Sequence, residues 1–460
     1  MISKSILETI PDDRFRAVCD GIISDMNRLP VMGAAIGIWH EGKEYTTGFG
    51  VTNVDHPLPV TDETMFQVGS ISKTFTATAV MRLVETGKID LDKPIRSYYP
   101  ELKLKDEAVA QKVTMRHLLT HSGGWDGDYF NDFGIGDDAL TKLVEKLADL
   151  PMQVSLGKIF SYNNMGFALA GKVIEIVTGK TCEEALKELV FEPLGLAKTF
   201  FFPHDILTHR FAVGHEVWEN EVKVARPWAV GRGIHPVGGI TCSVNELLRY
   251  ARFHIGDGIV DGNRILSTSS IKMMQTPALT WTNEQYVGLS WNIVNYGDTA
   301  TIGHGSATKG FLAQLRIVPS RDFAIAMLTN TDRGGLLNGV TIANAMKTFL
   351  GLELPQIAPI EVSAEKQQEC VGSYAYIFSR NEIKIVEGKL QLTQTQIAGF
   401  PTPETPLPPP TPPMNIAFYA SDKIVVLDGA LKDAHGEFLR DDNGKIKWFR
   451  IGARAKLREN

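Results

Sequence analysis

The 460-residue chain has few cysteines, no large excess of either charge and no long apolar run. Its four cysteines lack metal-ligand spacing and are too sparse for a disulfide scaffold, so we expect buried thiols. A net charge of −6 provides no electrostatic footprint for nucleic acid or an anionic membrane. The N-terminus carries charges and a proline where a secretory leader needs an unbroken apolar stretch, and no segment is long enough to span a membrane. We therefore expect a cytoplasmic protein with a small-molecule or peptide substrate.

The overall composition is that of a soluble globular protein. Hydrophobic residues make up 43% of the chain and charged residues 22%, which excludes global disorder, collagen and coiled-coil arrays. The length predicts two or three structural units, and we find no internal repeat.

Residues 1–351 read as one α/β (α+β) domain, an antiparallel sheet flanked by helices with an inserted helical subdomain at about 95–290. Strand patterns stand on both sides of that insertion, each with a helical pattern beside it. We expect helices at about 12–27, 70–84 and 336–350, a hairpin from 34–39 and 43–50, and strands at 301–304, 311–318 and 323–328.

The last hundred residues have a different pattern. A linker at 352–360 precedes 361–460, where short strands and one helix near Glu365 predict a small all-β barrel or sandwich. Eight of the 13 residues from Pro401 to Pro413 are proline, which cannot donate to a strand ladder, so we expect an exposed loop there. A ligand for a proline-recognition module is the alternative interpretation.

Ser70 and Lys73 form a Ser-x-x-Lys pair, which puts a hydroxyl and an amine one turn apart on a helix. The spacing alone is unspecific, because it recurs at four other places, including Ser155 with Lys158 and Ser269 with Lys272. The first pair differs in its context: a glycine precedes it and an apolar helix face follows. A serine at such a first turn feels the positive end of the helix dipole, which favours an alkoxide and a bound oxyanion. A capping serine with a surface lysine is the structural alternative.

Two further motifs could face the same cleft. Tyr162 and Asn164 supply a phenolate as proton acceptor and an amide that anchors substrate or lysine, unless Tyr162 only packs beside the next helix. The glycine-rich stretch 303–311 lies between two predicted strands, where a substrate backbone can approach a strand edge closely. This stretch lacks the Walker pattern, so we discard a phosphate loop.

Together, Ser70-x-x-Lys73, Tyr162-x-Asn164 and His304 resemble the active-site motifs of the serine β-lactamase and penicillin-binding-protein clan, on its branch of class C β-lactamases, D-aminopeptidases and esterases. The similarity extends over about residues 30 to 350 and includes FQVGSISKTFT at 66–76 and TMRHLLTHSG at 114–123. The C-terminal domain resembles the lipocalin-like tails of some peptidases in this clan.

The resemblance implies a metal-free and cofactor-free serine hydrolase. Ser70 would be the nucleophile, Lys73 a buried proton relay and Tyr162 the general base. Asn164 would hydrogen-bond the substrate amide and Lys73. Backbone N–H groups of Ser70 and Ala307 would form the oxyanion hole.

Two of the residues expected to bind the substrate differ from those that relatives usually have. His304 would stand in place of a common lysine and bind a substrate carboxylate through a partly charged imidazole. Ser306 would stand where relatives usually have glycine, and would narrow the cleft or contact substrate. We expect hydrolysis of a small peptide amide or an ester, with weak β-lactam hydrolysis as a side reaction.

Other interpretations are weaker. No serine has the Gly-x-Ser-x-Gly pattern of an α/β-hydrolase elbow. His117 and His121 have the spacing of a zinc pair but lack the accompanying glutamate, so we assign them a structural role. A non-catalytic penicillin-binding receptor or scaffold is the alternative function, although no membrane tether is visible. A homo-oligomer is compatible with the sequence.

Overall fold

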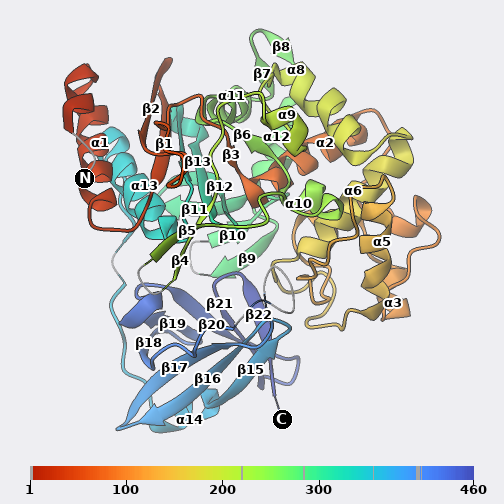
Figure 1. Cartoon of the computed structure of the whole chain (residues 1–460). Helices are drawn as coiled ribbons and strands as arrows, with labels where there is room; N and C mark the ends of the chain where they lie inside the picture. The colour runs from red at the N-terminus through yellow and green to blue at the C-terminus, as the bar shows by residue number, and fades with distance from the viewer. Residues whose placement is uncertain are drawn as a thin grey trace.

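A computed structural model describes residues 4–218, 221–282, 285–355, 357–399, 405 and 407–459. Eight strands form an antiparallel sheet with helices on both faces (Figure 1). The order across the sheet is β2 (Lys43–Gly50), β1 (Gly33–His40), β14 (Phe323–Thr329), β13 (Phe311–Val318), β12 (Thr299–Thr308), β11 (Asn292–Tyr296), β10 (Gln285–Val287) and β9 (Leu279–Thr282). The predicted fold class is confirmed.

The central strands are apolar on both faces because helices cover both. Ile36 and Ile325 face α1 (Asp13–Met26) and α13 (Gly334–Leu350), which pack side by side. The opposite face lies against α11 (Val244–Ile255), where Gly37 of β1 approaches closely: a Cβ there would lie 2.8 Å from Leu248. Asp12 begins α1 by accepting hydrogen bonds from two N–H groups of its first turn.

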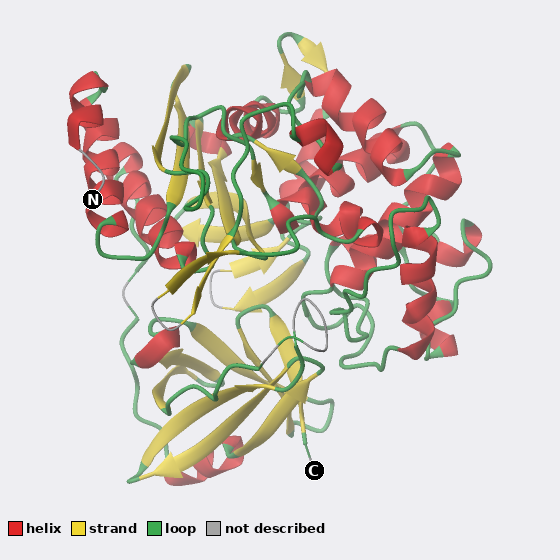
Figure 2. Cartoon of the chain, in the orientation of Figure 1, coloured by secondary structure: helices red, strands yellow, loops and turns green. Residues whose placement is uncertain are grey.

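A mainly helical part follows the first hairpin (Figure 2). Its core helices are α2 (Ser72–Glu85) and α6 (Asn164–Thr178), which contact each other. The other helices of this part are α3 (Glu107–Ala110), α4 (Met115–Leu119), α5 (Ala139–Glu145), α7 (Cys182–Leu186), α8 (Glu192–Leu194), α9 (Pro203–Ile206), α10 (His235–Gly238) and α12 (Thr268–Gln275). Three short strand pairs also lie there: β3 (Phe66–Gln67) with β6 (Thr241–Cys242), β4 (His215–Trp218) with β5 (Glu221–Val224), and β7 (Ile259–Val260) with β8 (Asn263–Arg264).

Two sequence predictions need correction here. The helical insertion was expected to reach about residue 290, but the main sheet already resumes with β9 at Leu279 because β9 and β10 pair beside β11. The glycine-rich stretch was expected to connect two strands, yet residues 303–308 belong to β12 itself. Glycines lowered the strand signal, but pairing with β13 holds the segment extended.

The C-terminal strands form a closed barrel, below the sheet in Figure 1. Helix α14 (Ala364–Cys370) precedes it, near the predicted position. The strands are β15 (Gly372–Tyr376), β16 (Ser379–Val386), β17 (Lys389–Gln396), β18 (Met414–Ala420), β19 (Lys423–Val426), β20 (His435–Arg440), β21 (Ile446–Ile451) and β22 (Arg454–Arg458). The boundaries at 351 and 361 stay a prediction.

The predicted proline loop lies between β17 and β18. Residues 401–404 and 406 fall outside the described residues, while 407–413 form an irregular segment that is mostly exposed. Thr411 holds this segment to the barrel, since its N–H and Oγ1 bond the backbone of Gln394.

The barrel docks on the helical part through β21 and on strand β9 of the sheet through the turn between β21 and β22. The indole Nε1 of Trp448 donates to the carbonyl oxygen of Gln153 at 2.7 Å. In the opposite direction, Nε1 of Trp281 donates to the carbonyl oxygen of Gly452 at 2.7 Å. These contacts bring barrel residues beside the residues predicted to carry chemistry.

Among the described residues, no helix combines the length and the apolar character required to cross a membrane.

Candidate active site

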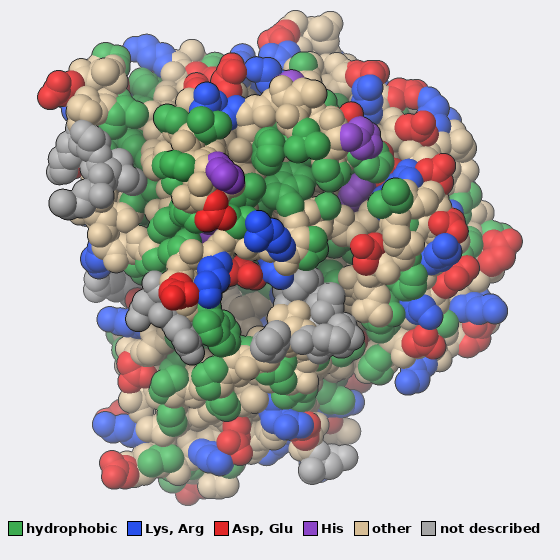
Figure 3. Space-filling model, viewed as in Figure 1, with side chains coloured by type: hydrophobic (Ala, Val, Ile, Leu, Met, Phe, Trp, Pro, Cys, Tyr) green, Lys and Arg blue, Asp and Glu red, His purple; other side chains and the backbone are tan. Residues whose placement is uncertain are grey.

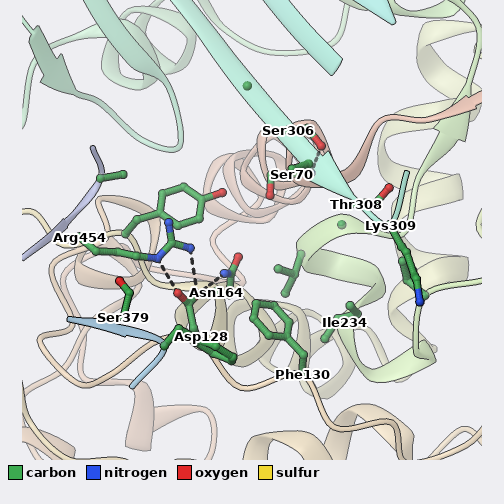
Figure 4. Close-up of a pocket in the computed structure, with 18 of the residues that line it drawn as sticks. Ser70, Asp128, Phe130, Asn164, Ile234, Ser306, Thr308, Lys309, Ser379 and Arg454 are labelled. Atoms are coloured by element: carbon green, nitrogen blue, oxygen red, sulfur yellow. Dashed lines mark hydrogen bonds and ion pairs between the residues drawn. The ribbon is translucent and has the colours of Figure 1, made fainter. Parts of the chain in front are cut away.

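A cavity of about 800 Å³ lies where the helical part, the edge of β12 and the barrel meet (Figure 4), and the surface is hollowed there (Figure 3). Six of the seven predicted site residues line this cavity, and Lys73 lies beneath it. The lining includes Ser70, Tyr162 and Asn164 from the helical part, His304, Ser306 and Ala307 from β12, and Tyr376, Gln394 and Arg454 from the barrel.

Ser70 lies in a short 3-10 turn, Gly69–Ile71, that leads directly into α2. The preceding strand fixes this turn, because the N–H of Val68 donates to the carbonyl oxygen of Ile240. Gly69 has a φ of +43°, and a Cβ at this position would lie 2.1 Å from Oγ of Ser306. Only glycine therefore allows the turn to approach β12 this closely.

Lys73 is completely buried one turn after Ser70. Its Nζ lies 3.0 Å from Ser70 Oγ and donates a hydrogen bond to the carbonyl oxygen of Val237 at 2.9 Å. Burial lowers the pKa of Lys73 well below its ordinary value, and the charge of Arg454 lowers it further. A neutral amine at this distance can accept the Ser70 proton.

Tyr162 lies over the same amine. Lys73 Nζ is 5.0 Å from the centre of its ring, and the imidazole of His121 stacks on the ring at 4.3 Å. Burial raises the pKa of Tyr162 above its ordinary value, although a hydrogen bond with Ser70 acts in the other direction. Burial therefore favours the neutral phenol over the phenolate at rest, and the role of Tyr162 as general base stays a prediction.

Asn164 begins α6 but does not hold Lys73. Its Nδ2 donates to Oδ1 of Asp128 at 2.5 Å, whereas the main-chain oxygen of Val237 takes the position expected for the amide beside Lys73. The predicted bond between Asn164 and Lys73 is thus wrong. The carboxamide oxygen of Asn164 is directed toward the cavity (Figure 4), where a substrate N–H can reach it.

Asp128 and Arg454 form an ion pair that sequence reasoning missed. Two guanidinium nitrogens of Arg454 bond the two carboxylate oxygens of Asp128, which is 4% exposed. The guanidinium also lies 4.9 Å from the centre of the Tyr162 ring. Burial lowers the pKa of the Arg454 guanidinium, but the attraction of the Asp128 carboxylate has the larger effect. The pKa of the guanidinium is therefore raised overall. No local sequence signal could reveal this pair, because its partners are 326 residues apart.

His304 is buried and uncharged. Burial, followed by the charge of Lys73, lowers the pKa of His304 to about 3. Its Nδ1 donates to the carbonyl oxygen of Gly305 at 2.7 Å, and its buried Nε2 has no hydrogen-bond partner among the described residues. The expected partly charged imidazole is therefore wrong, and Nε2 is a neutral acceptor.

Ser306 contacts the nucleophile's own backbone. Its Oγ accepts the N–H of Ser70 at 2.9 Å. Ser306 also lines the cavity, and its expected role of narrowing the cleft or contacting substrate stays a prediction. Ala307 is exposed to the cavity. Thr308 pairs with Phe311 across a two-residue turn, so Thr308 and the other even-numbered residues of β12 hydrogen-bond β13. The odd-numbered residues therefore direct their N–H groups away from β13. Since β11 pairs β12 only up to Gly303, the Ala307 N–H lies at an open edge.

The remaining predictions concern structural residues. The four cysteines are buried and unpaired, as predicted. His117 completes a capping box with Thr114 at the start of α4. His121 was assigned to packing below the cleft, and the structure puts it against Tyr162 itself.

Comparisons with known proteins agree on one fold. A family profile described as beta-lactamase matches residues 22–345. Penicillin-binding protein 4 of Amycolatopsis lactamdurans is 32% identical over 308 residues, which cover 65% of this chain and 81% of that protein.

Two solved structures cover nearly the whole chain. The crystal structure of SurE has a TM-score of 0.77 at 24% identity, covering 97% of this chain and 99% of that one. A second structure of SurE, with D-Leu, has a TM-score of 0.73. An octameric penicillin-binding protein homologue from Pyrococcus abyssi has a TM-score of 0.66 at 24% identity, covering 96% of this chain and 99% of that one.

Proposed function

Since this chain belongs to the β-lactamase family, whose members are generally serine hydrolases, we propose that it hydrolyses a small peptide amide or an ester through a covalent acyl-enzyme on Ser70. The observation that carries this proposal is the buried Lys73 amine, 3.0 Å from Ser70 Oγ at the floor of a cavity. An amine with a lowered pKa can remove the serine proton without a metal ion.

In the acylation step, Lys73 accepts the Ser70 proton while Oγ bonds the substrate carbonyl carbon and the π electrons move to the carbonyl oxygen. When the carbonyl re-forms, the bond to the amine or alcohol breaks. The Tyr162 phenol gives its proton to that leaving group and regains one from the Lys73 ammonium. Asn164 accepts a hydrogen bond from the substrate N–H through its carboxamide oxygen.

In the deacylation step, water bonds the acyl carbon and gives a proton to the Lys73 amine. The ester bond to Ser70 breaks, its oxygen recovers that proton, and the free acid leaves. Each turnover therefore consumes one water and returns Ser70, Lys73 and Tyr162 to their starting protonation states.

The cavity wall supports an apolar substrate group. Aromatic and aliphatic side chains line it, including Phe130, Trp228, Ile234, Trp281 and Phe378, with Pro408 and Pro409 from the proline segment. A volume of about 800 Å³ suits a ligand the size of a short peptide. A peptide with a D-residue is our preferred substrate, because SurE was crystallised with D-Leu and shares this fold.

The test combines labelling with turnover. A fluorophosphonate should add one adduct to the intact mass of the wild type and none to Ser70→Ala. p-Nitrophenyl esters, L- and D-aminoacyl anilides and a chromogenic cephalosporin then rank the substrates. Ser269→Ala, in another Ser-x-x-Lys match, is the control and should label normally. Full activity of Ser70→Ala would falsify the nucleophile assignment.

A non-catalytic penicillin-binding receptor is the second candidate, favoured by the hydrogen bond that occupies the Ser70 N–H. A β-lactam adduct that persists without turnover in the intact mass would favour this receptor, and turnover would favour the hydrolase. We also propose that the protein forms a homo-oligomer, as the octameric homologue does, which light scattering can test.

A further inference from the structure

We propose that the hydroxyl of Ser306 competes with the substrate for the oxyanion hole and thereby restrains acyl transfer at Ser70. This inference rests on the proposed function in one respect: Ser70 must be the nucleophile. It adds that the Ser306 hydroxyl occupies the place where the negative charge of the tetrahedral intermediate develops.

The first observation is the contact itself. The N–H of Ser70 donates to Ser306 Oγ at 2.9 Å, within the distance that an oxyanion would need from the same donor. Figure 4 shows the two serines facing each other across this bond.

The second observation is that the strand and the turn are built around this contact. Ser306 and Thr308 lie on one face of β12, and both would contact a Cβ on Gly69, at 2.1 and 2.8 Å. Gly69 has a positive φ, and the N–H of the following Ser70 donates to the Ser306 hydroxyl on this face. The hydroxyl is therefore held at the amide by the close approach of two backbone segments.

The third observation concerns the other donor. The Ala307 N–H lies at the edge of β12 that faces away from β13. Among the described residues, β11 pairs with this edge only as far as Gly303. The resting site thus presents one open amide and one that already has an acceptor. A backbone N–H has a single hydrogen, so the substrate oxygen must displace Ser306 Oγ before both donors can stabilise it.

The cost of this displacement applies whenever an oxyanion forms, in acylation and in deacylation. An ordinary hydrogen bond changes an equilibrium roughly two- to tenfold. Glycine at this position would leave the Ser70 N–H without a competitor. Ser306 therefore lowers the rate for every substrate by a similar factor.

The experiment compares wild type, Ser306→Gly and Ser306→Ala with phenylboronic acid, whose boron bonds Ser70 Oγ and puts an oxygen in the hole. Both variants should bind it roughly two- to tenfold more tightly and raise kcat/KM for p-nitrophenyl esters by a similar factor. Binding of a non-covalent carboxylate product should not change. Ala300→Gly, an exposed position on the same strand, is the control for a new glycine and should match wild type.

Each other outcome contradicts a specific statement. Unchanged boronate affinity in both variants overturns the competition, and weaker binding means that the Ser306 hydroxyl donates to the oxyanion instead. If Ser306→Gly loses its thermal transition, Ser306→Ala, which keeps the Cβ, decides between these results. A wild type that forms neither a boronate nor a fluorophosphonate adduct overturns the proposed function, and this inference with it.

Discussion

At the scale of single residues, the chemistry follows from how each side chain is buried. Lys73 and Tyr162 occupy one site, yet burial lowers the pKa of Lys73 and raises that of Tyr162. Each side chain is therefore neutral at rest, because burial penalises a charged ammonium and a charged phenolate alike. We therefore propose that the amine is the base in this site and that the phenol is the acid.

Replacing Lys73 should remove the base. Lys73→Met should lower kcat/KM by roughly 10²- to 10⁴-fold, the usual contribution of a general base. Lys272→Met, in another Ser-x-x-Lys match, is exposed and should leave kcat/KM unchanged.

The pH dependence of the wild-type rate tests whether Lys73 acts as a neutral base. The rate should fall as pH decreases through the lowered pKa of Lys73, because the ammonium cannot accept a proton. His304, with a pKa of about 3, should add no inflection near pH 6.5. A rate that rises on acidification in this range would contradict the assignment of Lys73 as the base.

At the scale of elements, the turn between β21 and β22 completes the site. The N–H of Tyr162 donates to the carbonyl oxygen of Ala453 at 2.7 Å, and the next residue, Arg454, pairs with Asp128. The turn and the first residue of β22 thus contact both the backbone and the ring of Tyr162. Arg454 acts through its neighbours, as a positioning residue.

Arg454→Met should destabilise the protein by about 3–5 kcal/mol, because it leaves the buried Asp128 carboxylate without its positively charged partner, although the hydrogen bond from Asn164 remains. Denaturant unfolding measures this cost. The double variant Asp128→Asn with Arg454→Met should recover much of the stability, yet its kcat should stay low, since the guanidinium no longer faces Tyr162.

The matched control is Arg380→Met. Arg380 also pairs bidentately, with Glu459, but both side chains are substantially exposed, so its loss should cost less than about 1 kcal/mol. Equal costs for the two arginines would show that burial of the Asp128 pair has no energetic consequence.

At the scale of the whole molecule, Asp126 joins the barrel to the helical part. Its Oδ2 accepts from the N–H of Ile377 and from Nε2 of Gln153, both at 3.0 Å. Burial raises the pKa of Asp126 from 3.8 to about 6. The folded protein therefore holds this proton more tightly than the unfolded chain, and stability falls as pH rises from about 4 to about 6.

Asp126→Asn keeps an oxygen for both donors and removes the buried charge. It should raise the free energy of unfolding at pH 7 by up to about 3 kcal/mol and flatten its dependence between pH 4 and 6. Urea unfolding across this range is the measurement. Asp92→Asn is a control of opposite sign, because Arg116 lowers the pKa of Asp92. A variant less stable than wild type at pH 7 would contradict the raised pKa.

Local sequence signals were sufficient for many elements. The helix predicted at about 336–350 is α13, which begins two residues earlier, and the apolar run at 323–328 became the buried β14. For residues 361–460 the sequence predicted a small all-β barrel or sandwich, and only the pairing of β15 with β22, which are distant in the chain, decided that it is a closed barrel.

The sequence by itself determined the spacing of Ser70 and Lys73 on one helix and the family to which their motifs point, because a helical turn fixes which residues are neighbours. The tertiary structure alone decided how deeply Lys73 and Tyr162 are buried, what holds the Ser70 N–H and how Arg454 reaches Tyr162. These depend on burial and on contacts between residues hundreds of positions apart, which no local pattern encodes.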